Sequence, residues 1–351
     1  MSLYSPCIKA IGPRTARIML IGEAPGEQEE LTGIPFIGYS GQELDRMLGE
    51  AGIRRSECYL TNVLQTRPPN NKIEAFCVKK KECGHSLPPM AQGRYLHPDL
   101  LPELERLKAE ITEVRPNLIV ALGNTALWAT LGVSGIRRYR GAVGLSPYGF
   151  GKILPTYHPA ALRDWSIRPI IVADLMKAAR ESAFPEIRRP NRSIHINPTL
   201  EEVEQWSTGL LAAPPPLLSI DTETKQRLIS CVSFSARIDH AFVIPFLCWR
   251  KPQHSYWTLE EECIVRKLVG RVLASPIPKL FQNGLYDIQY LRRERYKLFN
   301  IVEDTMLLHH ALYPELPKSL GFLGSIHTDE SAWKLMRKRG EDATLKLDDD
   351  E

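Results

Sequence analysis

The fold is decided by residues 17–41, which read RIMLIGEAPGEQEELTGIPFIGYSG. Four apolar residues at 18–21 stop at Gly22. The next four residues have the composition of a tight turn: Glu23, Ala24, Pro25 and Gly26. This pattern is typical of a buried strand that ends in a turn. Because open α/β sheets bind their ligands at strand ends, the sequence predicts a ligand site here that contains a carboxylate.

An aromatic residue follows on the same segment. Phe36 stands between Gly33 and Gly38, so we expect it on an exposed loop. A carboxylate and an aromatic ring at one strand end suit a flat, polar ligand such as a nucleobase.

Length and composition narrow the class of protein. The chain has 351 residues, more than one typical domain, so we expect two cores. It is 43% hydrophobic and 25% charged, and no apolar stretch is long enough to cross a bilayer. The N-terminus has no signal-peptide pattern, which predicts a cytoplasmic location, in the host cytoplasm if a phage encodes the chain. Seven scattered cysteines fit a reduced intracellular protein better than a disulfide scaffold.

The net charge of +4 does not by itself indicate a nucleic-acid partner. Each basic cluster taken alone fits a solvated face better than a phosphate-binding track. Beside base-binding motifs, however, the clusters support DNA binding. They lie at residues 79–81, 137–140, 188–189 and 292–293.

The first half alternates strands with helices, which predicts a mostly parallel, doubly wound sheet sandwiched by helices. The strand at 152–156 delivers Tyr157, His158 and Pro159 to the same edge as Glu23. The other expected strands cover 18–21, 59–64 and 117–122, and the expected helices cover 42–51 and 100–114.

A basic, Pro-containing segment at 184–192 reads as a linker. Beyond it, strands are expected at 193–196, 217–220, 228–234 and 240–245, and helices at 199–211 and 260–272. The expected organisation is a first domain at 1–183, the linker, a second α/β domain at 193–335 and a charged tail at 336–351.

Four motifs fall at strand ends of the first half. They are residues 22–26, Phe36, Thr61-Asn62-Val63, and residues 158–162 reading HPAAL. In these motifs and their order, residues 15–183 resemble the uracil-DNA glycosylase superfamily, most closely its family 4 branch. Each motif alone is explained by a turn, core or capping residue, but the ordered set is not. The resemblance implies a glycosylase-type α/β fold and release of uracil from single- or double-stranded DNA, with no cofactor in that step.

The residue types fit the chemistry that the resemblance implies. Breaking the glycosidic bond expels a uracil anion, so the site must stabilise negative charge and position water. By resemblance, Glu23 orients or activates the water, and Phe36 stacks under a uracil that has left the base stack. Asn62 hydrogen-bonds the uracil edge through its amide.

The resemblance also assigns roles to the second strand end. His158 lies near the leaving oxygen, and Leu162 is a wedge that enters the gap left by the base. The backbone around Gly22 and Pro159 contacts phosphates.

The cysteines depart from family 4, whose members carry four cysteines that bind an iron–sulfur cluster. Here Cys7 stands alone near the N-terminus, and Gln65-Thr66 precedes Arg-Pro-Pro where the family has a cysteine. We therefore predict no cluster. Cys77 and Cys83 remain candidate metal ligands together with Cys7, although a spacing of six is not usual for metal binding.

The second half has its own set of carboxylates. Asp221 and Glu223 are two residues apart on an expected strand, so they share one face. Asn283 and Asp287 come later, followed by Asp304. Carboxylates from separate elements suit a two-metal site that activates water.

Over residues 193–335 this half resembles the DEDD-type 3′–5′ exonuclease domain of family A DNA polymerases, including phage members, which is ribonuclease H-like. Asp221 and Glu223 match its first motif, and Asn283 with Asp287 its second. The resemblance implies Mg²⁺ or Mn²⁺ bound by Asp221, Glu223 and Asp287, with Asn283 contacting the substrate.

The third exonuclease motif, Tyr-x-x-x-Asp, is absent, since no tyrosine follows Tyr313. Three explanations remain open. A residue of the acidic tail substitutes, a separate polymerase chain completes the site, or this half is a degenerate DNA-binding module.

The sequence therefore predicts a DNA repair or replication protein linked to phage replication. It combines a uracil-DNA glycosylase with an exonuclease-like domain, acts on uracil-containing DNA, has a DNA polymerase as a possible partner and has no membrane partner. The alternative is a non-catalytic accessory subunit of a DNA polymerase that binds uracil or abasic DNA.

Overall fold

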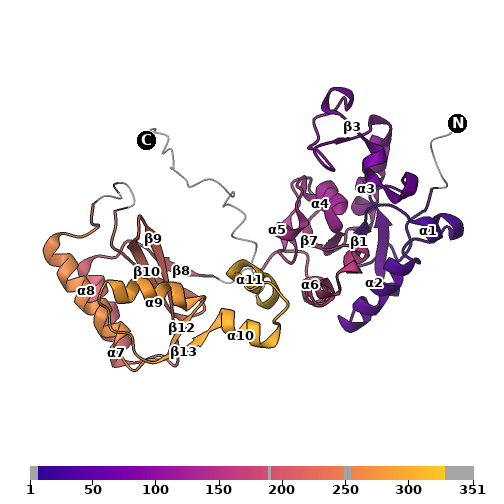
Figure 1. The fold of residues 1–351 in the computed structure, drawn as a ribbon. Helices are drawn as coiled ribbons and strands as arrows, with labels where there is room; N and C mark the ends of the chain where they lie inside the picture. Colours follow the sequence, from indigo (N-terminus) through magenta and orange to yellow (C-terminus); the bar gives the residue numbers. More distant parts are fainter. Residues whose placement is uncertain (1–6, 189–190, 249–250, 252–253, 329–351) are drawn as a thin grey trace. The chain divides into compact units, whose positions relative to one another are not determined.

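The chain forms two compact units. The computed structural model describes residues 7–188, 191–248, 251 and 254–328. The first unit comprises Met1–Arg189 with Gly321–Glu351, and the second comprises Pro190–Leu320. Each unit contains its own main sheet (Figure 1).

The sheet of the first unit has the strand order β2-β1-β5-β7-β6. Its first four strands run parallel and β6 pairs antiparallel with β7 at the edge. Every residue of the four parallel strands is buried, as expected for a sheet covered on both faces. The strands are β1 (Ile18–Gly22), β2 (Cys58–Asn62), β5 (Leu118–Leu122), β6 (Gly144–Leu145) and β7 (Lys152–Thr156).

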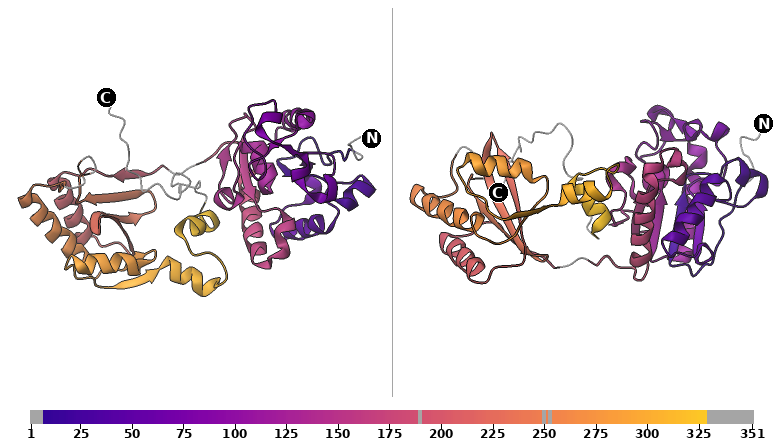
Figure 2. Two further views of the ribbon diagram at one scale, coloured as in Figure 1. Left: turned by 45° about the horizontal axis from the view of Figure 1, so that its top comes forward. Right: turned by 60° about the horizontal axis from the view of Figure 1, so that its bottom comes forward.

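Helices cover both faces of this sheet (Figure 2). Side chains alternate along β1, so Met19 and Ile21 join one core cluster while Ile18 and Leu20 join another. This confirms the expected doubly wound α/β arrangement. The helices are α1 (Glu27–Thr32), α2 (Tyr39–Glu50), α3 (Leu101–Val114), α4 (Gly123–Leu131), α5 (Ile136–Tyr139) and α6 (Arg168–Glu181). A small hairpin of β3 (Cys77–Val78) and β4 (Tyr95–Leu96) lies between α2 and α3 in the sequence.

The second unit has a mixed sheet in the order β13-β12-β9-β10-β11-β8. Strands β9, β10 and β11 are antiparallel, whereas β12 and β13 run parallel to β9, as expected for a ribonuclease H-like α/β domain. The strands are β8 (Ser193–His195), β9 (Leu218–Lys225), β10 (Leu228–Arg237), β11 (His240–Pro245), β12 (Lys279–Phe281) and β13 (Ile301–Asp304). The helices are α7 (Leu200–Ala212), α8 (Leu259–Leu273), α9 (Gly284–Arg293) and α10 (Thr305–Leu312). In the part of the chain that the structure describes, no helix is long and apolar enough to cross a membrane.

The division between the units differs from the expected domain limits at one end. It falls at residues 189 and 190, inside the expected linker, but returns to the first unit at Gly321 instead of ending the second domain at 335. The chain returns to the first unit because α11 (Leu320–His327) is bonded to α6 of that unit. Lys177 Nζ on α6 donates a hydrogen bond to the carbonyl of Ser325 on α11 at 2.6 Å. The expected tail, 336–351, lies outside the described residues.

Candidate functional site

A cleft of about 590 Å³ opens at the carboxyl ends of the parallel strands in the first unit. These ends meet at one edge because β2, β1, β5 and β7 all run the same way. We call it the strand-end cleft. The residues that line it include Glu23, Ala24, Pro25, Gly26, Phe36, Asn62, Tyr157 and His158.

Gly22 brings an amide and an aromatic ring together. A Cβ atom at this position would lie 2.4 Å from Asn62 Oδ1 and 2.7 Å from Phe36 Cζ. Real Cβ atoms essentially never show contacts under 3.0 Å, so any other residue here would displace the amide or the ring from the end of β1. An aromatic face and an amide edge thus converge at one point of the strand-end cleft.

The loop that carries Phe36 is held by a buried carboxylate. Glu29 on α1 accepts hydrogen bonds from the backbone N–H groups of Ile37 at 3.1 Å and Gly38 at 2.9 Å through Oε1. Its Oε2 accepts another from Gly26 at 3.0 Å. Phe36 has a φ of +56°, a left-handed backbone that a non-glycine residue adopts only when its surroundings impose it. Phe36 does lie on a loop, but hydrogen bonds hold that loop in place. Its side chain is only 7% exposed, whereas the sequence predicted an exposed one.

Asn62 ends β2 beside β1. Backbone bonds fix this end of the strand, since Val63 N donates to Gly22 O at 2.9 Å and Leu64 N to Glu23 O at 3.1 Å. Asn62 is only 5% exposed, yet its side-chain amide makes no hydrogen bond with the other described residues. Its acceptor and two donors therefore remain available to a ligand in the strand-end cleft.

Glu23 is a partly buried carboxyl at the end of β1. Burial raises the pKa of Glu23, and a hydrogen bond from Thr125 Oγ1 to its Oε2 opposes that shift. A carboxylate with a raised pKa is a better proton acceptor than an exposed one. Glu23 can therefore serve as a base toward a water molecule in the strand-end cleft.

His158 follows β7 and caps the short 3₁₀ helix that comes next. Its Nδ1 accepts a hydrogen bond from the N–H of Ala160 at 3.1 Å. The ring proton of the neutral imidazole must then be on Nε2. Burial lowers the pKa of His158 to about 4, so the ring is neutral at pH 7 and Nε2–H is a neutral donor.

Leu162, the expected wedge, is a core residue in the structure. It is 2% exposed and belongs to the core cluster that contains Ile171 and Leu175. A side chain packed in this way would have to leave the core to enter a DNA gap, so the wedge role of Leu162 stays a prediction from the sequence. Pro159 is likewise buried, whereas Ala24, Pro25 and Gly26 line the strand-end cleft.

In the second unit, Asp221 and Glu223 lie exposed on β9, and the buried Thr222 between them points to the other face. Asp287 on α9 accepts two hydrogen bonds from Thr222, from N at 2.8 Å and from Oγ1 at 2.6 Å, through one oxygen. Burial raises the pKa of Asp287.

The expected metal site of Asp221, Glu223 and Asp287 is therefore not assembled. Across residues 7–328, apart from the short undescribed gaps, no three His, Cys, Asp or Glu side chains form a group able to hold a metal ion. The donors are of the right kind for Mg²⁺ or Mn²⁺, but the described arrangement does not fit either ion.

Asn283 and Asp304 have structural tasks nearby. Asn283 is exposed, has a φ of +58° and begins α9. Asp304 ends β13, accepts a bond from Gly284 N at 2.7 Å and caps α10 through Met306 N at 2.8 Å. Its carboxylate therefore joins the starts of two helices.

Comparison with known proteins identifies the first unit. The family described as the uracil DNA glycosylase superfamily matches residues 9–180. A type-4 uracil-DNA glycosylase of Thermotoga maritima is 36% identical over 174 residues, which are 48% of this chain and 78% of that protein. The chain belongs to the uracil-DNA glycosylase superfamily.

A second likeness extends beyond the glycosylase-type unit. A DNA polymerase of Bacillus phage SP01 is 23% identical over 341 residues, which are 86% of this chain but only 33% of that polymerase. The crystal structure of Escherichia coli RNase D, an exoribonuclease, matches with 20% identity and a TM-score of 0.27, covering 38% of this chain and 31% of that chain.

The three cysteines considered as metal ligands each donate a hydrogen bond to a different oxygen atom. Cys7 Sγ donates to Gln65 Oε1 at 2.8 Å, Cys77 Sγ to the carbonyl of Ile73, and Cys83 Sγ to the carbonyl of Lys80. Burial raises the pKa of Cys77 to about 11, which disfavours the thiolate that binds metals. The three thiols are not brought together, so they do not fit the metal site considered from the sequence.

Three residues that hold parts of the strand-end cleft in place were not predicted from the sequence: Glu29, which lines it, Thr125, which bonds Glu23, and Arg106, which bonds the backbone of Asn62. Thr125 lies just after the strand at 117–122, so its position at the common edge was a usable signal. Glu29 and Arg106 stand in helices among other charged residues, where nothing in the spacing separates them from solvated side chains.

Proposed function

We propose that the first unit hydrolyses the N-glycosidic bond of uracil in DNA. The observation that carries the proposal is the convergence of the Phe36 ring and the Asn62 amide over Gly22, beside Glu23. A ring face and an amide edge are what a flipped, flat base with polar edges requires. Membership of the glycosylase superfamily supports the same function.

In this mechanism uracil leaves the base stack and lies against Phe36, with its edge hydrogen-bonded by Asn62. The bond from C1′ to N1 breaks, and its electron pair goes to the uracil ring. The Nε2–H of His158 donates a hydrogen bond to the uracil oxygen that gains negative charge. A neutral donor can stabilise this anion without first losing a proton.

Water completes the reaction. Glu23 accepts a proton from the water whose oxygen bonds to C1′, and that proton later leaves through solvent. The products are uracil, reprotonated from solvent, and an abasic sugar with a hydroxyl at C1′. Because Glu23 and His158 supply the proton acceptor and the donor, the step needs no metal.

The test uses uracil-containing single- and double-stranded oligonucleotides in EDTA, followed by alkali to cleave abasic sites. We expect alkali-dependent product from the wild-type chain and none above background from Glu23→Ala or Asn62→Ala. An Asp221→Ala chain is the matched control and should behave as wild type. Tight binding of uracil-DNA without base release would instead favour the non-catalytic polymerase accessory subunit.

For the second unit we propose an exonuclease-like, DNA-binding module in a replication setting. The likeness to a phage DNA polymerase supports the setting, and the shared exposed face of Asp221 and Glu223 supports the exonuclease-like character. Because one oxygen of Asp287 accepts two hydrogen bonds from Thr222, we expect this chain alone not to shorten 3′ ends in Mg²⁺ or Mn²⁺. Metal-dependent shortening that Asp221→Ala abolishes would instead establish a working nuclease.

A further inference from the structure

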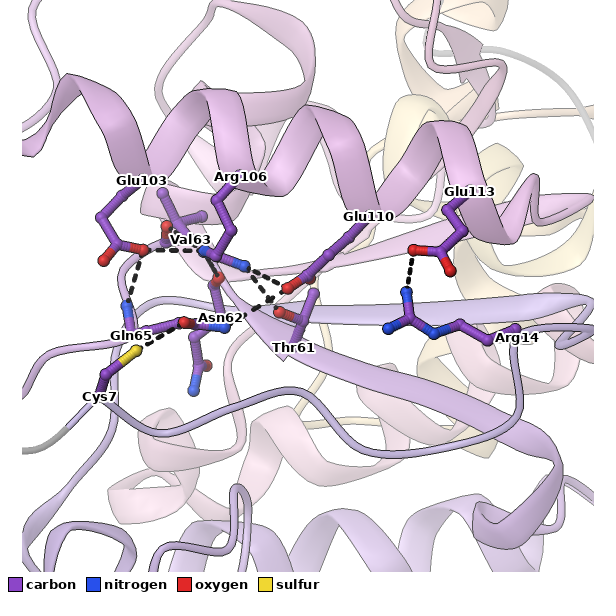
Figure 3. Close-up of polar contacts among 10 residues, drawn as sticks. All are labelled: Cys7, Arg14, Thr61, Asn62, Val63, Gln65, Glu103, Arg106, Glu110 and Glu113. Atoms are coloured by element: carbon purple, nitrogen blue, oxygen red, sulfur yellow. Dashed lines mark hydrogen bonds and ion pairs between the residues drawn. The ribbon is translucent and has the colours of Figure 1, made fainter.

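Arg106 reaches from α3 to the end of β2, where Asn62 lies (Figure 3). Its Nη2 donates to the carbonyl oxygens of Asn62 at 2.7 Å and Val63 at 2.9 Å. Its Nη1 donates to Thr61 Oγ1 at 3.2 Å. Three consecutive residues, including the one whose amide faces the strand-end cleft, are thus held by one guanidinium.

Two carboxylates on the same helix hold that guanidinium in place. Arg106 Nε donates to Glu103 Oε2 at 2.9 Å, and Nη1 lies 2.9 Å from Glu110 Oε1. They stand three residues before and four residues after Arg106, which places all three side chains on one face of α3. Together with the three contacts to residues 61–63, these give five partners for a group that has five N–H donors.

Glu103 and Glu110 also bond Gln65, which lies three residues after the end of β2. Gln65 N donates to Glu103 Oε2 at 3.3 Å, and Gln65 Nε2 donates to Glu110 Oε1 at 3.4 Å. The network therefore spans both sides of the Arg106 guanidinium, from Thr61 to Gln65. It holds the carbonyl side of this segment while the side chain of Asn62 stays available for a ligand.

We propose that Arg106 is a positioning residue that sets the orientation of the Asn62 amide toward the uracil edge. The proposal rests on the function proposed for the first unit. Arg106 does not line the strand-end cleft, so it acts through the backbone of Asn62 rather than on the base. Arg106 would act by fixing a geometry. Hydrogen bonds depend on direction, so an Asn62 amide that tilts would lose those it makes to the base.

Lysine is the informative replacement. It keeps the positive charge between Glu103 and Glu110 but has a compact ammonium with three donors, which cannot reproduce the fork of a guanidinium. We expect Arg106→Lys to lower the single-turnover rate of uracil release about tenfold while changing the affinity for uncut uracil-DNA less than about threefold. Thr61→Val, which removes one anchor and keeps the shape of the side chain, should cost about threefold in the same rate.

The matched control is Arg14, which pairs with Glu113 on the same helix and appears in the same view (Figure 3). This pair is more than half exposed and has no bond to the Asn62 segment. Arg14→Lys should leave the rate unchanged, and the melting temperatures of all variants are measured to exclude unfolding.

A double-mutant cycle separates positioning from a general structural role. If Arg106 acts through Asn62, Arg106→Lys should change the rate less than about twofold in an Asn62→Ala chain. Equal losses in both backgrounds, or an unchanged rate for Arg106→Lys alone, would overturn the proposal. If the wild-type chain releases no uracil, it is the proposed function that fails, and the two failures are therefore distinguishable.

Discussion

In the first unit, Glu23, Asn62 and His158 follow three parallel strands and meet around one cleft of about 590 Å³. In the second unit, Asp221 and Glu223 lie on the single strand β9, and Asp287 is bonded to the residue between them. The first set thus stands at the ends of buried strands, whereas Asp221 and Glu223 lie in the middle of a strand that is only half buried.

The two units differ in which acceptors satisfy the backbone N–H groups beside these residues. At the end of β2 in the first unit, the N–H groups of Val63 and Leu64 are satisfied by carbonyls of the neighbouring segment, so side chains remain for a ligand. In the second unit, β12 pairs with β9 only as far as Ser219. Thr222 N therefore takes a side-chain acceptor, Asp287, because a buried N–H needs a partner. The backbone of β9 thus engages the Asp287 carboxylate, whereas the backbone at the end of β2 leaves the Asn62 amide available.

The largest effect should follow from removing the amide at the assembled site. Asn62→Ala is expected to slow uracil release about 100-fold, because the base loses directional hydrogen bonds in a buried setting. Single-turnover kinetics on a uracil oligonucleotide measures it. Asn117→Ala is the control, since Asn117 bonds Ser182 O outside the strand-end cleft and should change the rate less than about twofold. Similar losses in both variants would contradict the account.

The aromatic face should matter next. Phe36→Leu keeps an apolar side chain but removes the ring, and stacking of a base on an aromatic is worth about 1–3 kcal/mol. We expect about a tenfold loss in the rate of uracil release. Phe150→Leu serves as control because Phe150 packs with Tyr148 in a separate hollow. A Phe36→Leu chain with the wild-type rate would remove stacking from the mechanism.

The pH dependence should distinguish Glu23 from His158. Glu23 must be ionised to accept a proton, and its pKa is raised above the ordinary 4.5, so the rate should fall as pH drops through a midpoint above 4.5. His158, with its pKa lowered to about 4, should add no transition above that midpoint. His158→Gln should therefore be slower with the same midpoint. Loss of the acid limb in His158→Gln would assign the limb to the histidine instead.

The smallest effect on activity should come from the second unit. Asp304→Ala removes the carboxylate that joins the starts of α9 and α10, at a cost of about 1–2 kcal/mol in local stability. Faster amide hydrogen exchange in residues 284–293 and 305–312 would report it. Uracil release should stay within about twofold of wild type. Asp239→Ala, in the exposed pair with Arg237, should change neither readout.

Much of this comparison could be predicted from the sequence. Apolar runs bounded by Gly22 and Gly123 located the buried strands, and parallel topology then placed Glu23, Asn62 and His158 on one edge. Those inferences use only local pattern and the rule that parallel strands share their carboxyl edge.

The failures concern side-chain direction and competition for partners. Sequence cannot tell whether Leu162 points to solvent or into the core that it joins with Leu175. Nor can it show that the Asp287 carboxylate accepts a hydrogen bond from the backbone N–H of Thr222 instead of binding a metal. The roles of Glu29 and Arg106 depend on loops and strand ends far away in the sequence, and spacing does not encode such contacts.

The most direct measurement is single-turnover uracil release in excess EDTA by three chains: wild type, Asn62→Ala, and Asp221→Ala combined with Glu223→Ala. The account predicts full release by the wild-type and the doubly substituted chain, and about 100-fold slower release by Asn62→Ala. Release that requires a divalent metal, or that is lost with Asp221 and Glu223 but not with Asn62, would contradict it.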